Sequence, residues 1–305
     1  MGKTVVITGS NGFIGSHTAK HLLNAGYQVI GVDIGSTSNV LGVEYKQLNL
    51  LSDDIDELLD EYSPYALIHC AGMADVNYSM QHPDSDFFMN VMMTRKILYA
   101  VKEKKTSMRM LYMSSAGVYG NPQKLPIEEN AERRSISPYA LHKTIVEDIC
   151  EYFNRQYSLD IRVLRIFSAY GNGLKKQIFW DMGQKIKNTG KLSLFGSGNE
   201  TRDFIHIDDL TSVISLILEA EQEKNAVYNV ANGKEVSIRQ VAELFCDTLG
   251  KPREIISFSN ENREGNPSNW CADISKVKKL GYVSQVTLSE GIRKYAEWLK
   301  DNSFI

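Results

Sequence analysis

Short apolar runs rich in β-branched residues alternate with amphipathic stretches along the first two-thirds of the chain. Apolar runs without polar alternation are typical of strands buried on both faces, and helices between them supply crossovers between parallel strands. The predicted strands are Thr4–Thr8, Gln28–Val32, Glu44–Leu48, Ala66–His69, Met108–Met113 and Ile161–Ile166. The predicted helices between them are Phe13–Ala25, Asp54–Glu61, Asp84–Glu103 and Pro138–Gln156. This order predicts an α/β protein with a Rossmann-like, doubly wound parallel sheet.

The pattern is less regular after Ser168 and predicts a smaller C-terminal α/β domain that packs closely on the first. Its predicted helices are Lys176–Asn188, Asp208–Glu219, Ser237–Leu249 and Leu288–Lys300. Asp208 and Ser237 are expected to cap helix N-termini, and Gly190 and Gly250 to end helices. The polar stretch Ser259–Asn269 is expected to be a surface loop.

The composition narrows the range of functions. Of 305 residues, 43% are hydrophobic and 23% are charged, which excludes a mainly disordered chain. Lys and Arg total 34 against 37 for Asp and Glu, so the net charge of −3 provides no positive field to hold a nucleic acid. The longest apolar run, Val213–Leu218, is too short to span a membrane. The chain starts with strand residues and a Gly-rich turn, unlike a signal peptide.

Four scattered cysteines, Cys70, Cys150, Cys246 and Cys271, form no CxxC pair and have no histidine at ligand spacing. This spacing is unlike that of a disulfide framework or a zinc site. We therefore expect a soluble cytoplasmic protein without a bound metal.

Three glycines, Gly9, Gly12 and Gly15, stand between the first predicted strand and the first predicted helix. The first glycine permits a tight turn, the second lets main-chain N–H groups approach a pyrophosphate, and the third allows close packing of strand and helix. The positive end of the helix would face the phosphates. Glycines are common in loops, but this position between strand and helix favours a dinucleotide site.

Asp33 ends the second predicted strand, 18 residues after Gly15. A carboxylate at this place accepts hydrogen bonds from ribose hydroxyls and repels a 2′-phosphate. No Arg or Lys lies between Asp33 and Glu44 to bind that phosphate. The sequence therefore favours NAD over NADP, with a solvated turn residue as the alternative interpretation of Asp33.

Ser114 and Ser115 follow the fifth predicted strand, and Tyr139 and Lys143 share one face of a later helix. The Lys143 ammonium and a positively charged nicotinamide would favour the Tyr139 phenolate. Lowering a tyrosine pKa from about 10 to about 7 takes roughly 4 kcal/mol. Ser115 would then hold a substrate oxygen where the phenolate can remove its proton. A surface pair would also give this spacing, but the upstream glycines favour a catalytic site.

These residues resemble motifs of the extended short-chain dehydrogenase/reductase superfamily, and within it the NAD-dependent epimerase/dehydratase family that acts on nucleotide sugars. The matching segments span nearly the whole chain: Gly9–Gly15, Asp33, His69–Gly72, Asn90–Thr94, Ser114–Gly120, Tyr139 with Lys143, Arg165–Gly171, Phe195–Asp203, Arg263–Gly265 and Ala272–Asp273. The resemblance implies an NAD-binding domain in residues 1–167, with a returning segment near 205–232. Residues 168–305 would mainly bind the substrate.

The resemblance also implies roles for single residues. Those expected to contact NAD are Gly9, Asn11, Gly12, Phe13, Ile14, Gly15, Asp33, Asn49, Leu50, Ala71, Gly72, Asn90, Ser114, Tyr139, Lys143 and Phe167. Those expected to contact the substrate are Ser115, Tyr139, Ser168, Phe195, Arg202, Arg263 and Trp270. Arg202 and Arg263 would bind the diphosphate, and the bulk of Trp270 would limit the substituent at C2 of the sugar. Asn49 and Ser168 depart from the family, which usually has Asp and often has Asn there.

The residues after Ser115 bear on the reaction. Ala116 and Gly117 cannot transfer a proton, which disfavours the dehydratases and decarboxylases of the family, since these carry carboxylates there. A 4-epimerase acting on a UDP-sugar is the leading hypothesis, with a 4-keto-sugar reductase as the alternative. A non-catalytic nicotinamide sensor is a third hypothesis, against which the intact Ser115, Tyr139 and Lys143 argue. The apolar helices Asp84–Glu103 and Pro138–Gln156 would pair across a homodimer, as they do in the family.

Overall fold

A seven-stranded parallel sheet forms the centre of the computed structural model, which describes residues 2–104, 108–221, 224–261, 265 and 267–305. The strands are β1 (Thr4–Thr8), β2 (Gln28–Asp33), β3 (Glu44–Gln47), β4 (Ala66–His69), β5 (Arg109–Ser115), β6 (Asp160–Ile166) and β11 (Val227–Val230). Their order is β11-β6-β5-β4-β1-β2-β3, and every neighbouring pair is parallel. The doubly wound sheet expected from the sequence is confirmed.

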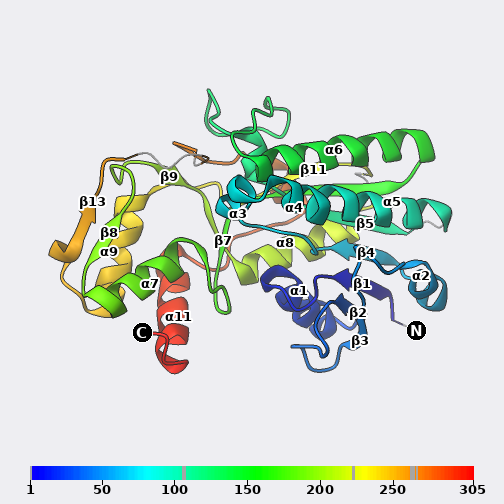
Figure 1. Cartoon of the computed structure of the whole chain (residues 1–305), viewed down its shortest axis with the longest axis horizontal. Coiled ribbons are helices and arrows are strands. Elements are labelled where there is room, and N and C mark those ends of the chain that lie inside the picture. Colours follow the sequence, from blue (N-terminus) through cyan, green and yellow to red (C-terminus); the bar gives the residue numbers. More distant parts are fainter. Residues whose placement is uncertain (1, 105–107, 222–223, 262–264, 266) are drawn as a thin grey trace.

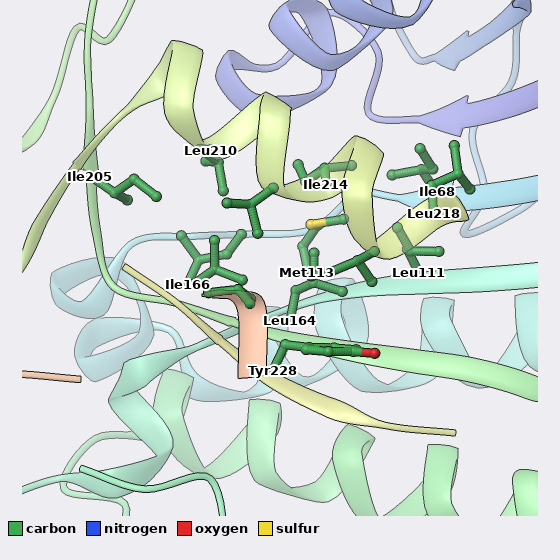
Figure 2. Packing of buried hydrophobic residues seen from close by; sticks show 14 of the residues in the cluster. Ile68, Leu111, Met113, Leu164, Ile166, Ile205, Leu210, Ile214, Leu218 and Tyr228 are labelled. Carbon is green, nitrogen blue, oxygen red and sulfur yellow. The ribbon is translucent and has the colours of Figure 1, made fainter. Parts of the chain in front are cut away.

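Alternate residues of each strand face opposite sides of the sheet and pack against different helices. One side carries α1 (Phe13–Asn24) and α8 (Ile207–Glu219), and the other carries α2 (Asp56–Tyr62), α5 (Met93–Glu103) and α6 (Pro138–Tyr157). Figure 2 shows side chains from α8 and from the strands beneath it: Leu210, Ile214, Leu218, Ile68, Leu111, Met113 and Leu164. Helices on both sides explain why the strands are apolar without alternation.

A smaller lobe lies beside the sheet, on the left in Figure 1, and holds the C-terminus. Its helices are α7 (Gln177–Thr189), α9 (Ile238–Leu249) and α11 (Leu288–Asp301), which share a core around Phe179, Phe245 and Tyr295. Three two-stranded sheets accompany them: β7 (Ser168–Tyr170) with β10 (Phe204–His206), β8 (Leu192–Leu194) with β13 (Ile256–Phe258), and β9 (Thr201–Arg202) with β12 (Val236–Ser237). Within the described ranges, no helix is long and apolar enough to cross a membrane.

The chain returns to the main sheet after β10, because α8 packs against α1 and β11 pairs with β6. Asp203, fully buried just before β10, joins the segments on either side of this return. Its carboxylate accepts hydrogen bonds of 2.9 to 3.0 Å from the main-chain N–H groups of Asn232, Gly233 and Ala272. These bonds offset the cost of burying the carboxylate and hold three distant segments together.

The predicted helix Asp84–Glu103 is wrong as a single regular element. It is replaced by α4 (Pro83–Phe87), the π-helical turn η1 (Phe88–Met92) and α5. In this turn the N–H of Met93 binds the carbonyl of Phe88, five residues earlier. The side-chain Nδ2 of Asn90, within the turn, donates to the main-chain oxygen of Asp86 at 3.1 Å.

Helix ends follow the predicted signals with one exception. Ser237 caps α9, and Gly190 and Gly250 end α7 and α9 in the left-handed conformation, as expected. Asp208 is not the N-cap of α8, because His206 takes that place and its Nδ1 accepts from the Asp208 N–H at 3.3 Å. Asp208 lies in the first turn, where its charge favours the helix dipole. Part of the predicted loop Ser259–Asn269 lies outside the described residues.

Candidate functional site

The glycine segment turns the chain from β1 into α1 at the carboxyl edge of the sheet. A Cβ on Gly9 would lie 2.6 Å from the nitrogen of Ala71, and one on Gly15 only 2.1 Å from the oxygen of Gly9. Gly12 caps α1 without any side-chain hydrogen bond, and the first turn of α1, which includes Phe13 and Ile14, has no acidic residue. The N–H groups of this turn are therefore available to an anion, and the turn fits the pyrophosphate of a dinucleotide.

Asp33 lies beside this turn at the end of β2. Its Oδ2 accepts from the Asn11 N–H at 2.9 Å, and its Oδ1 accepts from the Ile34 N–H at 2.8 Å. The Asn11 side chain also donates to the oxygen of Thr37 and accepts from the N–H of Asn39. Each Asp33 oxygen keeps a lone pair that a ribose hydroxyl can use, so the geometry fits the role inferred from the sequence.

The residues expected beside the adenine take part in local contacts. Asn49 accepts from the Leu51 N–H through its Oδ1, and its own N–H donates to Asp53 at 2.8 Å. Leu50 is buried among the apolar side chains on the α2 and α5 side of the sheet. Contact of Asn49 and Leu50 with an adenine remains a prediction.

Ser115, Tyr139 and Lys143 lie close together at the carboxyl edge of the sheet. Ser115 ends β5, while Tyr139 and Lys143 lie in the first two turns of α6. The Lys143 Nζ lies 5.8 Å from the centre of the Tyr139 ring and donates to the main-chain oxygen of Met113 at 2.9 Å. The Ser115 Oγ accepts from the Gly117 N–H at 3.1 Å. The three residue types thus meet at the same edge of the sheet as the glycine turn.

Burial sets the charge of these groups. It raises the pKa of Tyr139 to about 12, although hydrogen bonding to Ser115 acts in the opposite direction. Burial also lowers the pKa of Lys143 to about 8. The phenolate expected from the sequence depends in addition on the charge of a bound nicotinamide, so it remains a prediction. In this structure the loss of water around the phenol favours its neutral form.

A buried ion pair between Glu147 and Arg165 lies next to Ser114, the residue before Ser115. Glu147 accepts from Arg165 through hydrogen bonds of 3.1 and 2.7 Å, and from the Ser114 hydroxyl at 2.5 Å. Arg165 also donates to the Tyr119 hydroxyl at 2.8 Å. Ser114 was expected to contact the cofactor, but its hydroxyl is buried and bonded to Glu147. That hydroxyl can still accept a hydrogen bond through its lone pairs, so its contact with the cofactor remains a prediction.

Asn90 and Gly72 face each other near the end of β4. The main-chain oxygen of Asn90 accepts from the Thr94 hydroxyl at 2.6 Å, and His69 links Thr94 to Thr8 through bonds of 2.9 and 2.7 Å. Burial lowers the pKa of His69 to about 3, so its ring is neutral. These contacts fix η1 to the ends of β1 and β4, beside the residues expected to line the nicotinamide.

Arg202 and Trp270, two of the residues expected to contact the substrate, stack on each other. The Arg202 guanidinium lies 5.5 Å from the centre of the Trp270 ring and donates to the main-chain oxygen of Thr201. Burial lowers the pKa of Arg202 to about 10, and no ion pair joins it to a carboxylate in the part of the chain that the structure describes. Trp270 donates from Nε1 to the Gly120 oxygen at 3.0 Å and packs edge-on against Phe167.

The other residues predicted to contact the substrate are Ser168, Phe195 and Arg263. Ser168 begins β7 and donates from its N–H to the oxygen of Asp203 at 3.0 Å. The Phe195 side chain is 54% exposed, with the Lys185 Nζ 5.8 Å from its ring centre. Arg263 lies outside the described residues. The structure thus brings Arg202, Trp270 and Phe167 together.

Sequence reasoning missed two polar pairs that involve the helices predicted only as apolar. Asp86 in α4 binds His142 in α6 at 2.6 Å, and Glu147 in α6 binds Arg165 in β6. The available signal was a charged residue on an apolar face, but the sequence separation of 56 between Asp86 and His142 hides their contact. Among the described residues, no group of three or more His, Cys, Asp and Glu could hold a metal.

Residues 5–231 match the model of the NAD dependent epimerase/dehydratase family. A putative UDP-glucose 4-epimerase of Methanocaldococcus jannaschii is 30% identical over 308 residues, which cover 98% of this chain and 99% of the relative. The UDP-glucuronic acid 4-epimerase of Bacillus cereus, solved with UDP-glucuronic acid and NAD, superposes with a TM-score of 0.89, 26% identity, and 98% and 99% coverage. The UDP-N-acetylglucosamine 4-epimerase of Methanobrevibacter ruminantium M1, solved with UDP-N-acetylmuramic acid, superposes with a TM-score of 0.89 at 26% identity. The match covers 99% of each chain. This chain therefore belongs to the NAD dependent epimerase/dehydratase family.

Proposed function

We propose that this protein is a cytoplasmic, NAD-dependent nucleotide-sugar 4-epimerase that acts through a transient 4-keto sugar. The observation that carries the proposal is the grouping of Ser115, Tyr139 and Lys143 at the sheet edge that carries the glycine turn, with Ala116 and Gly117 directly after Ser115. No carboxylate at these two positions is available for a dehydration step. The related 4-epimerases support a UDP-sugar as the substrate. The unpaired thiols of all four cysteines suit a reducing cytoplasm.

The residues expected to hold NAD surround the glycine turn. The N–H groups at the start of α1 would bind the pyrophosphate, and Asp33 would accept from the ribose. Lys143, which contacts β5, and Asn90, which faces Gly72, would lie on the nicotinamide side. We accordingly propose that residues 1–167, with the returning segment 205–232, form the cofactor domain and that the other residues mainly bind the sugar nucleotide.

The chain's own residues would perform the proton transfer. Tyr139 would remove the proton of the sugar 4-hydroxyl, and Ser115 would hold that oxygen in reach. When bound, NAD would supply a hydride acceptor and a further positive charge. With a pKa of about 12, Tyr139 needs roughly 7 kcal/mol of additional stabilisation to ionise at pH 7. Lys143 is the residue placed to supply part of that stabilisation.

Arg202 is placed to hold the substrate through its diphosphate. Arg202 is half-buried, and its described partners are main-chain oxygens and the Trp270 ring. A guanidinium that forms no salt bridge with the described residues is suited to bind a ligand anion. Epimerisation requires the keto sugar to present both faces, so strong anchoring of the diphosphate and weak contacts to the hexose are the arrangement we expect.

We also propose that the protein forms a homodimer through α5 and α6. These helices pack against each other at the upper right of Figure 1. Large apolar side chains remain exposed on α5, α6 and the adjoining η1: Phe88, Met92, Tyr99, Leu141 and Tyr152. Clustered exposed apolar residues are typical of protein interfaces. Sedimentation analysis of wild type and Leu141→Asp checks this, because a charge in the interface should shift the dimer toward monomer.

A substrate panel tests the proposed activity. Purified protein with NAD is incubated separately with UDP-glucose, UDP-N-acetylglucosamine and UDP-glucuronate, and proton NMR identifies the C4 epimer. We expect one of these sugars to be epimerised without net consumption of NAD. Net oxidation of added NADH by a UDP-4-keto sugar, without epimer formation from the panel, would instead establish the reductase. Tyr139→Phe is the control that should lose the activity and remain folded.

A further inference from the structure

Asp86 and His142 form a buried pair that the proposed proton transfer does not use. The Asp86 side chain is fully buried in α4, and its Oδ2 lies 2.6 Å from Nδ1 of His142 in α6. The His142 ring packs edge-on against Phe87, with 5.3 Å between ring centres. Burying a carboxylate is costly unless hydrogen bonds replace the lost water. The pair therefore ties α4 to α6 immediately before Lys143.

Asp86 also determines how the Asn90 side chain is oriented. The Asn90 Nδ2 donates to both the main-chain oxygen and Oδ1 of Asp86, each at 3.1 Å. Because both amide hydrogens are directed at Asp86, the Asn90 oxygen faces away from it. That Oδ1 is buried, has no hydrogen-bond partner among the residues described, and would lie 2.8 Å from a Cβ placed on Gly72.

A buried acceptor without a partner is unfavourable, and a ligand donor is a common resolution of such a group. The Asn90 oxygen is directed at Gly72, one of the residues expected to line the nicotinamide. The ribose hydroxyls and the carboxamide of a nicotinamide nucleotide are donors of the required kind. Turning the Asn90 amide by 180° would present its NH₂ group to the ligand instead and lose this match.

We propose that Asp86 and His142 are positioning residues, which lock the Asn90 amide with its oxygen toward a donor of the bound nicotinamide nucleotide. Asp86 takes both amide hydrogens of Asn90, and His142 fixes the carboxylate by donating to its other oxygen. The proposal rests on the proposed function only for the identity of the cofactor. It adds that cofactor affinity depends on two residues that act through Asn90 and are not among the expected cofactor contacts.

NAD binding to purified protein, stripped of nucleotide and measured by isothermal titration calorimetry, tests the proposal. Asn90→Ala should weaken NAD binding about tenfold, because the acceptor is lost. Asp86→Ala combined with His142→Leu removes both members of the pair and leaves no buried charge unpaired. This pair replacement should also weaken NAD binding about tenfold. In a chain that already carries Asn90→Ala, it should weaken NAD binding little further.

Two further variants separate positioning from general stability. Asp86→Asn keeps an oxygen for the Asn90 amide and should retain NAD affinity within about threefold. Asp208→Asn alters another His–Asp contact, that of His206 with a largely exposed carboxylate, and should bind NAD like wild type. Thermal denaturation establishes that each variant is folded. If the pair replacement does not fold, Asp86→Ser takes its place in the same cycle.

Equal weakening by the pair replacement with and without Asn90→Ala would assign the pair a purely structural role and overturn the proposal. NAD affinity unchanged by the pair replacement, or by Asn90→Ala, would overturn it as well. NAD binding is measured without a sugar nucleotide. The experiment can therefore contradict the positioning role of Asp86 and His142 without contradicting the proposed epimerase function, and the reverse also holds. If the effects of the pair replacement and of Asn90→Ala on NAD affinity are not additive, but the protein epimerises no UDP-sugar, only the proposed function is contradicted. If the protein epimerises a UDP-sugar and the two effects are additive, only the positioning role is contradicted.

Discussion

Replacing Lys143 with methionine tests whether its ammonium supplies charge that ionises Tyr139. Methionine fills a similar buried space without the charge. The Lys143 Nζ lies 5.8 Å from the Tyr139 ring centre. At an effective dielectric constant of about 20, a unit charge at that distance stabilises a phenolate by roughly 3 kcal/mol, or about two pKa units. Loss of the cation disfavours the phenolate, so the pKa of Tyr139 rises and the activity that needs the phenolate moves to higher pH.

The pH dependence of kcat at saturating NAD and UDP-sugar measures this change. The rate rises with pH as Tyr139 ionises, and in Lys143→Met this rise should lie about two pH units higher. At a pH below both transitions, kcat should fall about 100-fold. Lys276→Met is the matched control, because the Lys276 Nζ also donates to a main-chain oxygen, that of Val227, and lies in α10 (Ser275–Lys279). An unshifted rise in Lys143→Met at saturating NAD would refute the role of the ammonium.

Three further outcomes are expected. Tyr139→Phe should lose most turnover and retain NAD affinity, because only the proton acceptor is removed; near-normal turnover would mean that another residue is the base. NAD should bind more tightly than NADP by about 1–3 kcal/mol, since Asp33 would face the 2′-phosphate, and equal affinities in parallel titrations would contradict that position. Glu147→Ala should lower the free energy of unfolding in urea by about 3–5 kcal/mol, because Arg165 would remain buried without its partner; a double Glu147→Met, Arg165→Met variant should lose less.

The specificity prediction concerns Trp270. UDP-glucose should be turned over at least about tenfold better than UDP-N-acetylglucosamine by wild type, because overpacking the site with an acetamido group costs about 1–3 kcal/mol. Trp270→Ala should reduce that preference. Equal use of both sugars by wild type, or a ratio unmoved by the substitution, would show that Trp270 does not limit the C2 substituent.

Much of the fold could be predicted from local patterns. The apolar strands and the glycine turn depend on neighbouring residues, and the parallel sheet follows from their alternation with helices. The π-helical turn could not be predicted this way, because it adds one residue to a helical turn inside a segment that the sequence pattern described only as apolar. The cap of α8 was misplaced for a related reason: His206 and Asp208 are both able to accept a hydrogen bond, and only the backbone conformation shows which one does.

The residue types of the site could be predicted from the sequence. The protonation states of their side chains could not be predicted as well. Tyr139 and Lys143 were expected to be close because they are four residues apart on a helix. Their protonation depends on burial by residues from α3 (Val76–Gln81), α4 and β5, which spacing does not report. The Asp86–His142 contact was equally hidden, since it joins two helices that the sequence pattern described only as apolar.

The fate of the hydrogen at C4 tests the central claim most directly. The protein is incubated in D₂O with NAD and the UDP-sugar that it accepts, and NMR and mass spectrometry locate deuterium in the C4 epimer. If Ser115, Tyr139 and Lys143 handle only the hydroxyl proton while the hydride leaves and returns within the site, the epimer carries protium at C4 and no reduced cofactor accumulates. Deuterium at C4 would contradict this account, because it would show that the carbon-bound hydrogen exchanges with solvent.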